Sequence, residues 1–168
     1  MSTSSIRYIS GTSSLGLLLL AFSAEGLCAL LLGDDLITLE QDLARRFPGL
    51  PTPQRDESLM PALEQTLRHL EDPRIALDLP LDLTGSVFQR RVWEILRQIP
   101  LGETASYRDI AQRLGKPGAF RAVANACGAN PVAVIVPCHR VLRQDGSLGG
   151  YRWGLERKRQ LLDREVSR

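Results

Sequence analysis

The stretch VPCHRV, at residues 136–141, decides how the second half of this chain is interpreted. A cysteine and a histidine are adjacent in it, an arginine follows them, and an apolar run bounded by prolines, PVAVIVP at residues 131–137, leads into it. Such a run predicts a short buried strand, so Cys138 is expected where that strand ends. Three interpretations of the Cys-His pair are then open: a nucleophile with its base, a pair of metal ligands, or the end of an ordinary buried strand.

The cysteine and histidine content argues against metal ligands. The chain has three cysteines and two histidines, and it has no Cys-x-x-Cys pair. A structural zinc site usually takes four ligands, so we predict no metal site. An odd and sparse set of cysteines is also no disulfide framework and suits a reducing compartment. We therefore expect a cytoplasmic protein.

The neighbours of Cys138 favour a nucleophile. Cationic groups lower the pKa of a thiol, and His139 and Arg140 follow directly. An imidazole accepts protons near neutral pH and in turn needs an acid that orients it. Successive residues of a strand point to opposite faces, so a water that bridges the pair is as consistent as a direct hydrogen bond. Cys28 and Cys127 lie in apolar or Ala-rich segments and are interpreted as core residues.

The distribution of charge divides the chain near residue 83. Residues 1–85 carry six Lys and Arg against twelve Asp and Glu, a net charge of −6, whereas residues 86–168 carry fifteen against seven, a net charge of +8. A basic half that follows an acidic half indicates that one of them faces a polyanion. We place one domain at residues 1–82 and a second domain at residues 83–168.

The first half is predicted to be a small α/β domain with an antiparallel sheet. Strands are expected near residues 6–9, 15–22 and 27–32, and helices at residues 36–47 and around Leu63, Leu67 and Leu70. The proline-rich stretch 48–57 is expected to be a loop. The apolar stretch 15–33 resembles a membrane span, but Ser23, Glu25 and Gly26 interrupt it. A charge in mid-membrane is costly, so we predict a β-hairpin and no membrane association.

The second half is predicted to be mainly helical, with helices over residues 86–99, 106–115 and 119–130. A short turn that contains glycine joins the last two, as in a helix-turn-helix, which we place at about residues 106–129. The second helix of the pair carries one basic residue, Arg121, among small residues, and such a surface is poorly suited to reading base edges. A generic helical hairpin is therefore an equal alternative on pattern alone.

Several motifs resemble the O6-alkylguanine-DNA alkyltransferase family, and most closely the C-terminal part of its bacterial Ada type. They are IVPCHRV at 135–141, Asn130, SY at 106–107, RAV at 121–123 and QDGSLGGYRWGLERKRQLLDRE at 144–165. The resemblance covers the second half of the chain well and the first half loosely. It implies a ribonuclease H-like α/β domain followed by a mainly α domain with a helix-turn-helix and a short active-site strand.

The resemblance also implies roles for individual residues. Cys138 would accept the alkyl group, His139 would deprotonate it through a water, and Glu165 would orient His139. Asn130 would hold the turn that positions the active-site segment. Tyr107 would press on the phosphate 3′ to the target nucleotide, help to rotate that nucleotide out of the duplex, and be a candidate proton donor to the leaving guanine.

On the DNA-binding helix, Arg121 would enter the base stack and fill the gap, because its guanidinium is planar and stacks. The small side chains of the same helix would let it press closely on the DNA in the minor groove. These small residues are Ala122, Ala124 and Gly128.

The implied reaction is a direct displacement that leaves a thioether on Cys138, so the protein acts once, as a methylated-DNA–protein-cysteine methyltransferase, and needs no cofactor. Tyr151, Trp153 and Val141 would line the substrate pocket, and the bulk of Trp153 would favour methyl over large alkyl groups. The implied partner is double-stranded DNA that contains O6-alkylguanine, with O4-alkylthymine as a further candidate lesion. No obligate protein partner is evident, and we expect a monomer.

Three alternatives stay open. A DNA binder of the same fold that lacks the acceptor cysteine is disfavoured by the presence of Cys138. A helix-turn-helix regulatory fragment of an Ada-type protein, without independent catalysis, fits if the chain is part of a longer one. A Cys-His hydrolase is distinguished by its turnover, because it releases many product molecules per protein molecule.

Overall fold

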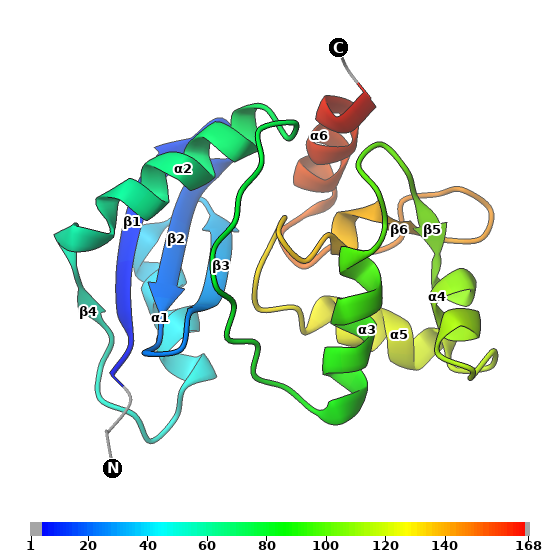
Figure 1. Cartoon of the computed structure of the whole chain (residues 1–168), viewed down its shortest axis with the longest axis horizontal. Helices are drawn as coiled ribbons and strands as arrows, with labels where there is room; N and C mark the ends of the chain where they lie inside the picture. Colours follow the sequence, from blue (N-terminus) through cyan, green and yellow to red (C-terminus); the bar gives the residue numbers. More distant parts are fainter. Residues whose placement is uncertain (1–4, 167–168) are drawn as a thin grey trace. The chain divides into compact units, whose positions relative to one another are not determined.

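The computed structural model describes residues 5–166 of the chain, which divides into two compact units between Leu83 and Thr84 (Figure 1). The first unit contains β1 (Arg7–Ser13), β2 (Gly16–Phe22), β3 (Leu27–Gly33), α1 (Leu36–Arg46), β4 (Gln54–Arg55), the 3₁₀ turn η1 (Glu57–Leu59) and α2 (Met60–Glu71). The second unit contains α3 (Val87–Arg97), β5 (Ala105–Ser106), α4 (Tyr107–Arg113), α5 (Phe120–Gly128), the 3₁₀ turn η2 (Cys138–Arg140), β6 (Val141–Leu142) and α6 (Leu155–Val166).

The sheet of the first unit has the strand order β3-β2-β1-β4 (Figure 1). The three predicted strands are confirmed and pair antiparallel, but β4 joins β1 in parallel. The prediction of a purely antiparallel sheet is therefore wrong, and the sheet is mixed. β4 lies in the stretch predicted as a loop, where Gln54 N donates to the Ile6 carbonyl and Asp56 N to the Tyr8 carbonyl. A strand of two residues is too short to show the alternation by which strands are recognised.

Helices cover both faces of this sheet, which explains the apolar stretch at residues 15–33. The pairing register places Gly11 and Gly33 on opposite faces. A Cβ on Gly11 would meet Leu63 of α2, and a Cβ on Gly33 would meet Leu39 of α1, so α1 and α2 pack on opposite sides. Strands buried on both faces have continuous apolar sequences. Within residues 5–166, no helix has the length and apolar character that crossing a membrane requires.

The helices α3, α4 and α5 begin within one residue of where the sequence indicated and are shorter than predicted, whereas α6 was not predicted. α3 and α4 each start with a capping box, in which Ser86 or Ser106 exchanges hydrogen bonds with the third residue of the helix. Trp93 of α3 is buried, and its Nε1 donates to the carbonyl of Ala126 in α5 at 2.9 Å. α5 is thereby fixed against α3, with its other side exposed.

The prediction of a strand over residues 131–137 is wrong, because this segment forms a compact turn. Asn130 is fully buried and closes the turn from both ends: its Oδ1 accepts from Val132 N and its Nδ2 donates to the Val136 carbonyl, each at 2.9 Å. Within the turn, Ile135 N donates to the Ala133 carbonyl at 2.7 Å. The residue between them, Val134, has a positive φ of 70°, which is unfavourable for a β-branched residue.

The short strand of the active-site segment follows the cysteine instead of preceding it. β6 pairs in parallel with β5, Val141 opposite Ala105 and Leu142 opposite Ser106. Ser106 is also the N-cap of α4. The pairing therefore fixes the segment after Cys138 to the start of α4, on which Tyr107 lies.

Candidate active site

Cys138 is the first residue of η2 and is almost completely buried. The turn that precedes it places the thiol beside Asn130, whose Nδ2 donates to Sγ at 3.2 Å. An amide donor stabilises a thiolate more than a thiol. Asn130 therefore has two functions in the structure: it closes the turn, and it provides a hydrogen bond to the reactive sulfur.

His139, Glu165 and Arg140 form a buried chain behind the cysteine. His139 is fully buried, and its Nε2 lies 2.7 Å from Glu165 Oε2. Arg140 donates to both carboxylate oxygens of Glu165, from Nε at 2.9 and 3.1 Å and from a terminal nitrogen at 2.9 Å, and to the Ile99 carbonyl at 2.7 Å. The structure thus brings together His139 and Glu165, which the resemblance had paired across 26 positions of sequence.

The acid-base state of the cluster follows from burial. Burial raises the pKa of the Cys138 thiol to about 11, although the Asn130 hydrogen bond and the charge of Lys158 act in the opposite direction. Burial lowers the pKa of His139 against the effect of Glu165. Burial also raises the pKa of Glu165, but the hydrogen bonds from His139 and Arg140 outweigh it and bring this pKa down to about 2.

At neutral pH the cluster therefore holds a thiol, a neutral imidazole and a carboxylate. Because the Glu165 carboxylate only accepts hydrogen bonds, His139 Nε2 carries the proton and donates to it. The other ring nitrogen, Nδ1, is then unprotonated, and it is buried without a hydrogen-bond partner among the described residues. A buried polar atom without a partner is unusual. Nδ1 therefore keeps a lone pair that can accept a proton.

Lys158 of α6 is a site residue that the sequence analysis missed. It is fully buried, and its Nζ donates to the carbonyls of Val141 at 2.7 Å, Leu148 at 2.5 Å and Gly150 at 3.0 Å. Burial lowers its pKa to about 8. A signal was present in the sequence, because Lys158, Leu161 and Glu165 are spaced so that they share one face of a helix.

Arg140 also differs from its prediction. Its guanidinium was expected to lower the pKa of the adjacent Cys138, but it binds Glu165 instead, and the pKa of Cys138 is raised. Adjacency along the chain gave the wrong contact because the three residues of η2 point in different directions around a tight turn. The positive charge that acts on the thiol is that of Lys158.

A cavity of about 150 Å³ opens onto the thiol. It is lined by Tyr107, Ala124, Cys127, Gly128, Cys138, Gly150, Tyr151 and Arg152. Cys127, interpreted from the sequence as a core residue, is buried but also faces this cavity. Tyr151 lines it as predicted, and its buried hydroxyl has no hydrogen-bond partner among the described residues.

The other two predicted pocket residues, Val141 and Trp153, do not line this cavity. Val141 is fully buried, and its carbonyl accepts from Lys158. Trp153 is nearly buried and packs edge-on against Tyr151, with the ring centroids 5.4 Å apart and the planes at 67°. Both residues are therefore behind the wall of the cavity and support it.

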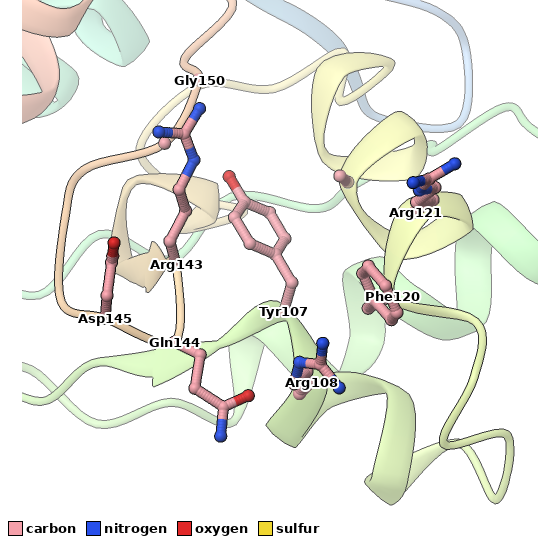
Figure 2. A pocket seen from close by; sticks show the side chains of 10 residues that line it. Tyr107, Arg108, Phe120, Arg121, Arg143, Gln144, Asp145 and Gly150 are labelled. Carbon is pink, nitrogen blue, oxygen red and sulfur yellow. The ribbon is translucent and has the colours of Figure 1, made fainter.

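A second cavity of about 500 Å³ adjoins the first and shares Tyr107, Ala124 and Gly150 with it. Figure 2 shows its lining, with Tyr107 at the centre, Arg121 on α5 and Arg143 on the loop that follows β6. Burial raises the pKa of Tyr107 to about 12, so its hydroxyl stays protonated at neutral pH. We call this second cavity the arginine cleft, because Arg108, Arg121 and Arg143 line it.

The predicted DNA-binding residues of α5 lie together on its exposed side. They are Arg121, Ala122, Ala124 and Gly128. The opposite side of α5 is buried through Val123, Ala126 and Cys127. The exposed side is thus almost free of bulky side chains next to the two cavities.

A buried thiol, an imidazole base oriented by a carboxylate, and an adjoining cleft lined by arginines define a protein with a cysteine nucleophile. Comparison with known proteins identifies the family. Residues 87–167 match the family model described as 6-O-methylguanine DNA methyltransferase, DNA binding domain. The chain is 47% identical over 121 residues to the inducible methylated-DNA–protein-cysteine methyltransferase of Bacillus subtilis, covering 72% of this chain and 68% of that protein.

A solved structure shows the same relationship over nearly the full length. The crystal structure of Mycobacterium tuberculosis OGT in complex with DNA matches with a TM-score of 0.79 and 38% identity, covering 95% of this chain and 92% of that one. The chain belongs to the O6-methylguanine-DNA methyltransferase family.

The Ada-type relatives are longer than this chain. The bifunctional transcriptional activator/DNA repair enzyme Ada of Escherichia coli is 48% identical over 161 residues, which cover 96% of this chain and 46% of Ada. The chain therefore spans about half the length of this relative.

Proposed function

We propose that the protein repairs O6-alkylguanine in duplex DNA by transferring the alkyl group irreversibly to its own Cys138. The observation that carries the proposal is the buried set of Cys138, His139 and Glu165, of which Cys138 lines a small cavity beside the arginine cleft. Relatives named as methylated-DNA–protein-cysteine methyltransferases support it. O4-alkylthymine is proposed as a second lesion of the same chemistry.

The proposed reaction begins with removal of the thiol proton. His139 Nδ1, the unpaired buried base, takes this proton through a water, and Glu165 stabilises the imidazolium that forms. The thiolate, stabilised by the Asn130 hydrogen bond, attacks the alkyl carbon. A carbon–sulfur bond forms, the bond from that carbon to O6 breaks, and guanine leaves with a proton for which the Tyr107 hydroxyl is the proposed donor. The thioether has no ready leaving group, so each molecule acts once and no cofactor is required.

Access to the lesion requires that the nucleotide leave the base stack, at a cost of a few kcal/mol. We propose that Arg121 fills the gap, that Tyr107 presses on the 3′ phosphate, and that α4 and α5 act as a helix-turn-helix in the minor groove. The small exposed residues Ala122, Ala124 and Gly128 support a close approach of α5 to the DNA. Affinity would then come mainly from phosphates, with little dependence on base sequence.

We further propose a ribonuclease H-like fold for the domain at residues 1–82, supported by the order β3-β2-β1-β4 with β4 parallel to β1, and the DNA-binding, alkyl-acceptor role for the domain at residues 83–168. A monomer without an obligate protein partner suffices, since all the proposed catalytic groups come from one unit. The three free cysteines support a reducing, cytoplasmic setting.

Mass spectrometry after incubation with O6-methylguanine DNA tests the main proposal. We expect one added CH2 per protein molecule, on the peptide that contains Cys138, and none in Cys138→Ala. Cys127→Ala is the matched control, since Cys127 lines the same cavity, and it should still be methylated. Absence of an adduct, or an adduct that persists in Cys138→Ala, would refute alkyl transfer to Cys138. Release of many product molecules per protein would indicate a Cys-His hydrolase.

A further inference from the structure

The arginine cleft is where the backbone of an extruded nucleotide has to lie if its base enters the cavity at Cys138. The cleft and the cavity share Tyr107, Ala124 and Gly150. A base that passes between these residues leaves its sugar and phosphate on the cleft side. The cleft lining comes from three segments, namely the starts of α4 and α5 and the loop after β6. The cationic side chains of this lining differ in whether they can bind a phosphate in the cleft.

Two of the three arginines are directed away from the Tyr107 hydroxyl (Figure 2). The guanidinium of Arg108 lies 4.5 Å from the centroid of the Phe120 ring, over its face. Arg121 projects from α5 away from Tyr107 (Figure 2) and has the stacking role proposed above. Arg143 extends alongside Tyr107 towards Gly150 (Figure 2), and its charge lowers the pKa of Tyr107 against the effect of burial. No side-chain hydrogen bond or ion pair of Arg143 occurs within residues 5–166.

One acidic residue also lines the cleft, Asp145. Its carboxylate accepts hydrogen bonds from the backbone N and the hydroxyl of Ser147, at 3.0 and 2.7 Å. These bonds, and then the charge of Arg143, lower its pKa. Asp145 is therefore engaged in its own turn, and the Arg143 guanidinium keeps its donors for a ligand in the cleft.

The loop is built to hold Arg143 in this place. Arg143 N donates to the Ser147 carbonyl at 3.0 Å, and Gly146 N donates to the Arg143 carbonyl at 2.9 Å. Further along the loop, Lys158 binds the carbonyls of residues 148 and 150. A Cβ on Gly149, whose φ is +70°, would lie 3.0 Å from the Tyr107 hydroxyl and 3.5 Å from Arg143 Cγ. Glycine here is what allows Tyr107 and Arg143 to lie side by side.

We propose that Arg143, together with Tyr107, binds the phosphate 3′ to the extruded nucleotide in the arginine cleft. The inference rests on the proposed function and adds the residue that holds the DNA backbone at the lesion. A guanidinium presents a planar pair of donors that matches phosphate oxygens. Tyr107 presses on the same phosphate with its ring and keeps its hydroxyl proton for the leaving guanine. Because a phosphate carries no base information, this contact serves every lesion that the acceptor cavity admits.

The experiment compares three substrates that differ in this phosphate. They are duplex DNA with O6-methylguanine, the same duplex with one neutral methylphosphonate 3′ to the lesion, and free O6-benzylguanine, which has no phosphate. Single-turnover transfer to Cys138 is measured for the wild type, Arg143→Gln and the control Arg97→Gln. Arg97 is an exposed arginine of α3 outside the cleft, so its replacement removes the same charge elsewhere.

We expect Arg143→Gln to slow transfer from the normal duplex about tenfold, which is the usual effect of losing a charge-assisted hydrogen bond. With free O6-benzylguanine, the rate of this variant should be within about twofold of the wild-type rate. On the methylphosphonate duplex, wild type and Arg143→Gln should react at the same rate, and Arg97→Gln should match the wild type throughout.

A full Arg143→Gln defect on the methylphosphonate duplex, an equal loss on free O6-benzylguanine, or an equal loss in Arg97→Gln would each overturn the inference. So would a wild-type rate of Arg143→Gln on the normal duplex. These outcomes are distinct from failure of the proposed function, in which wild-type Cys138 takes no alkyl group from any of the three substrates.

Discussion

At Cys138, burial and reactivity oppose each other. Burial raises the pKa of the thiol to about 11, so the thiol form predominates at neutral pH. Only the thiolate is a strong nucleophile. In the proposed reaction the acceptor is therefore held as the less reactive thiol, and a base has to remove its proton when a lesion is bound. His139, the neighbour of Cys138 in sequence, is the proposed base, because its Nδ1 has no partner among the described residues and its Nε2 is linked to Glu165.

The pH dependence of transfer tests this view of His139. Burial lowers the pKa of His139 below its ordinary 6.5, and a base is active above its pKa. We expect the single-turnover rate with O6-methylguanine DNA to be flat from pH 7.5 down to 6.5 and to fall only at lower pH. The range stops at pH 7.5 because Lys158, whose charge acts on the thiol, has a pKa of about 8 and loses that charge above it. His69→Gln, which removes the other histidine, should leave the profile unchanged. A rate at pH 6.5 that is half the plateau would show that His139 titrates normally and would contradict this assignment.

We propose that Trp153 influences the width of the acceptor cavity indirectly, through Tyr151. It does not line the cavity, but its edge-on contact holds the Tyr151 ring in the wall. We expect Trp153→Ala to let Tyr151 move back and to raise the rate with O6-benzylguanine, relative to that with O6-methylguanine DNA, by about tenfold, a usual size for discrimination by pocket volume. Denaturant unfolding of the variant controls for the loss of a buried ring. Equal wild-type rates with both substrates, or an unchanged ratio in the variant, would count against the idea.

Single residues show how far the sequence could predict the site. The motif around Cys138 resembled a known family, and its His139 and Glu165 do meet in space. The partner of Arg140 could not be read from adjacency, because its direction depends on the turn η2 and on where α6 packs. Lys158 was hidden among the neighbouring charges of α6, since a buried lysine is rare and a surface position is the usual expectation. Contacts made by long polar side chains depend on packing that periodicity does not encode.

For helices and strands, the periodicity of apolar residues predicted the regular elements. It failed where the hydrogen bonds of one side chain determine the backbone conformation. The helices α1 to α5 and the first three strands follow from apolar spacing and serine caps. No helix was predicted where α6 lies. The run at residues 131–137 has the composition of a strand, but Asn130 closes it into a turn through three hydrogen bonds, one of them to the thiol. β4 was missed because it has only two residues, too few to show the alternation of a strand.

The turn makes a prediction about stability at Val134. Its φ of 70° lies in the left-handed region, which costs a residue with a Cβ about 1–2 kcal/mol and glycine much less. We expect Val134→Gly to be more stable than Val134→Ala by about 1 kcal/mol, the reverse of the order in regular structure. The two variants differ only by one methyl group. The difference between their free energies of unfolding therefore reports mainly on the backbone conformation at residue 134. Urea unfolding measures this difference, provided that the free energy of unfolding depends on urea concentration with the same slope in both variants. If Val134→Ala is the more stable, the turn does not hold this conformation in solution.

For the whole chain, the separation of charge distinguishes the two units. The acidic first half and the basic second half, with net charges of −6 and +8, are consistent with DNA binding by the second unit. The sheet of the first unit is covered on both faces by its own helices, and its described residues supply none of the groups that line the two cavities. On this view, the number of phosphates neutralised depends on the second unit, and charge changes in the first unit have little effect on binding.

The salt dependence of DNA binding separates the contribution of charges in the second unit from that of charges in the first unit. The logarithm of the association constant for duplex DNA falls linearly with the logarithm of salt concentration, with a slope of about −0.9 per phosphate neutralised. Arg108 and Arg113 are exposed on α4, the first helix of the proposed helix-turn-helix, which in such motifs crosses the DNA backbone. We expect Arg108→Gln with Arg113→Gln to reduce the steepness of the slope by about 2. Arg45→Gln with Arg68→Gln removes the same charge from exposed positions of the first unit and should leave the slope unchanged. Equal slopes for the two double variants would show that net charge, and not a DNA-binding surface on the second unit, determines affinity.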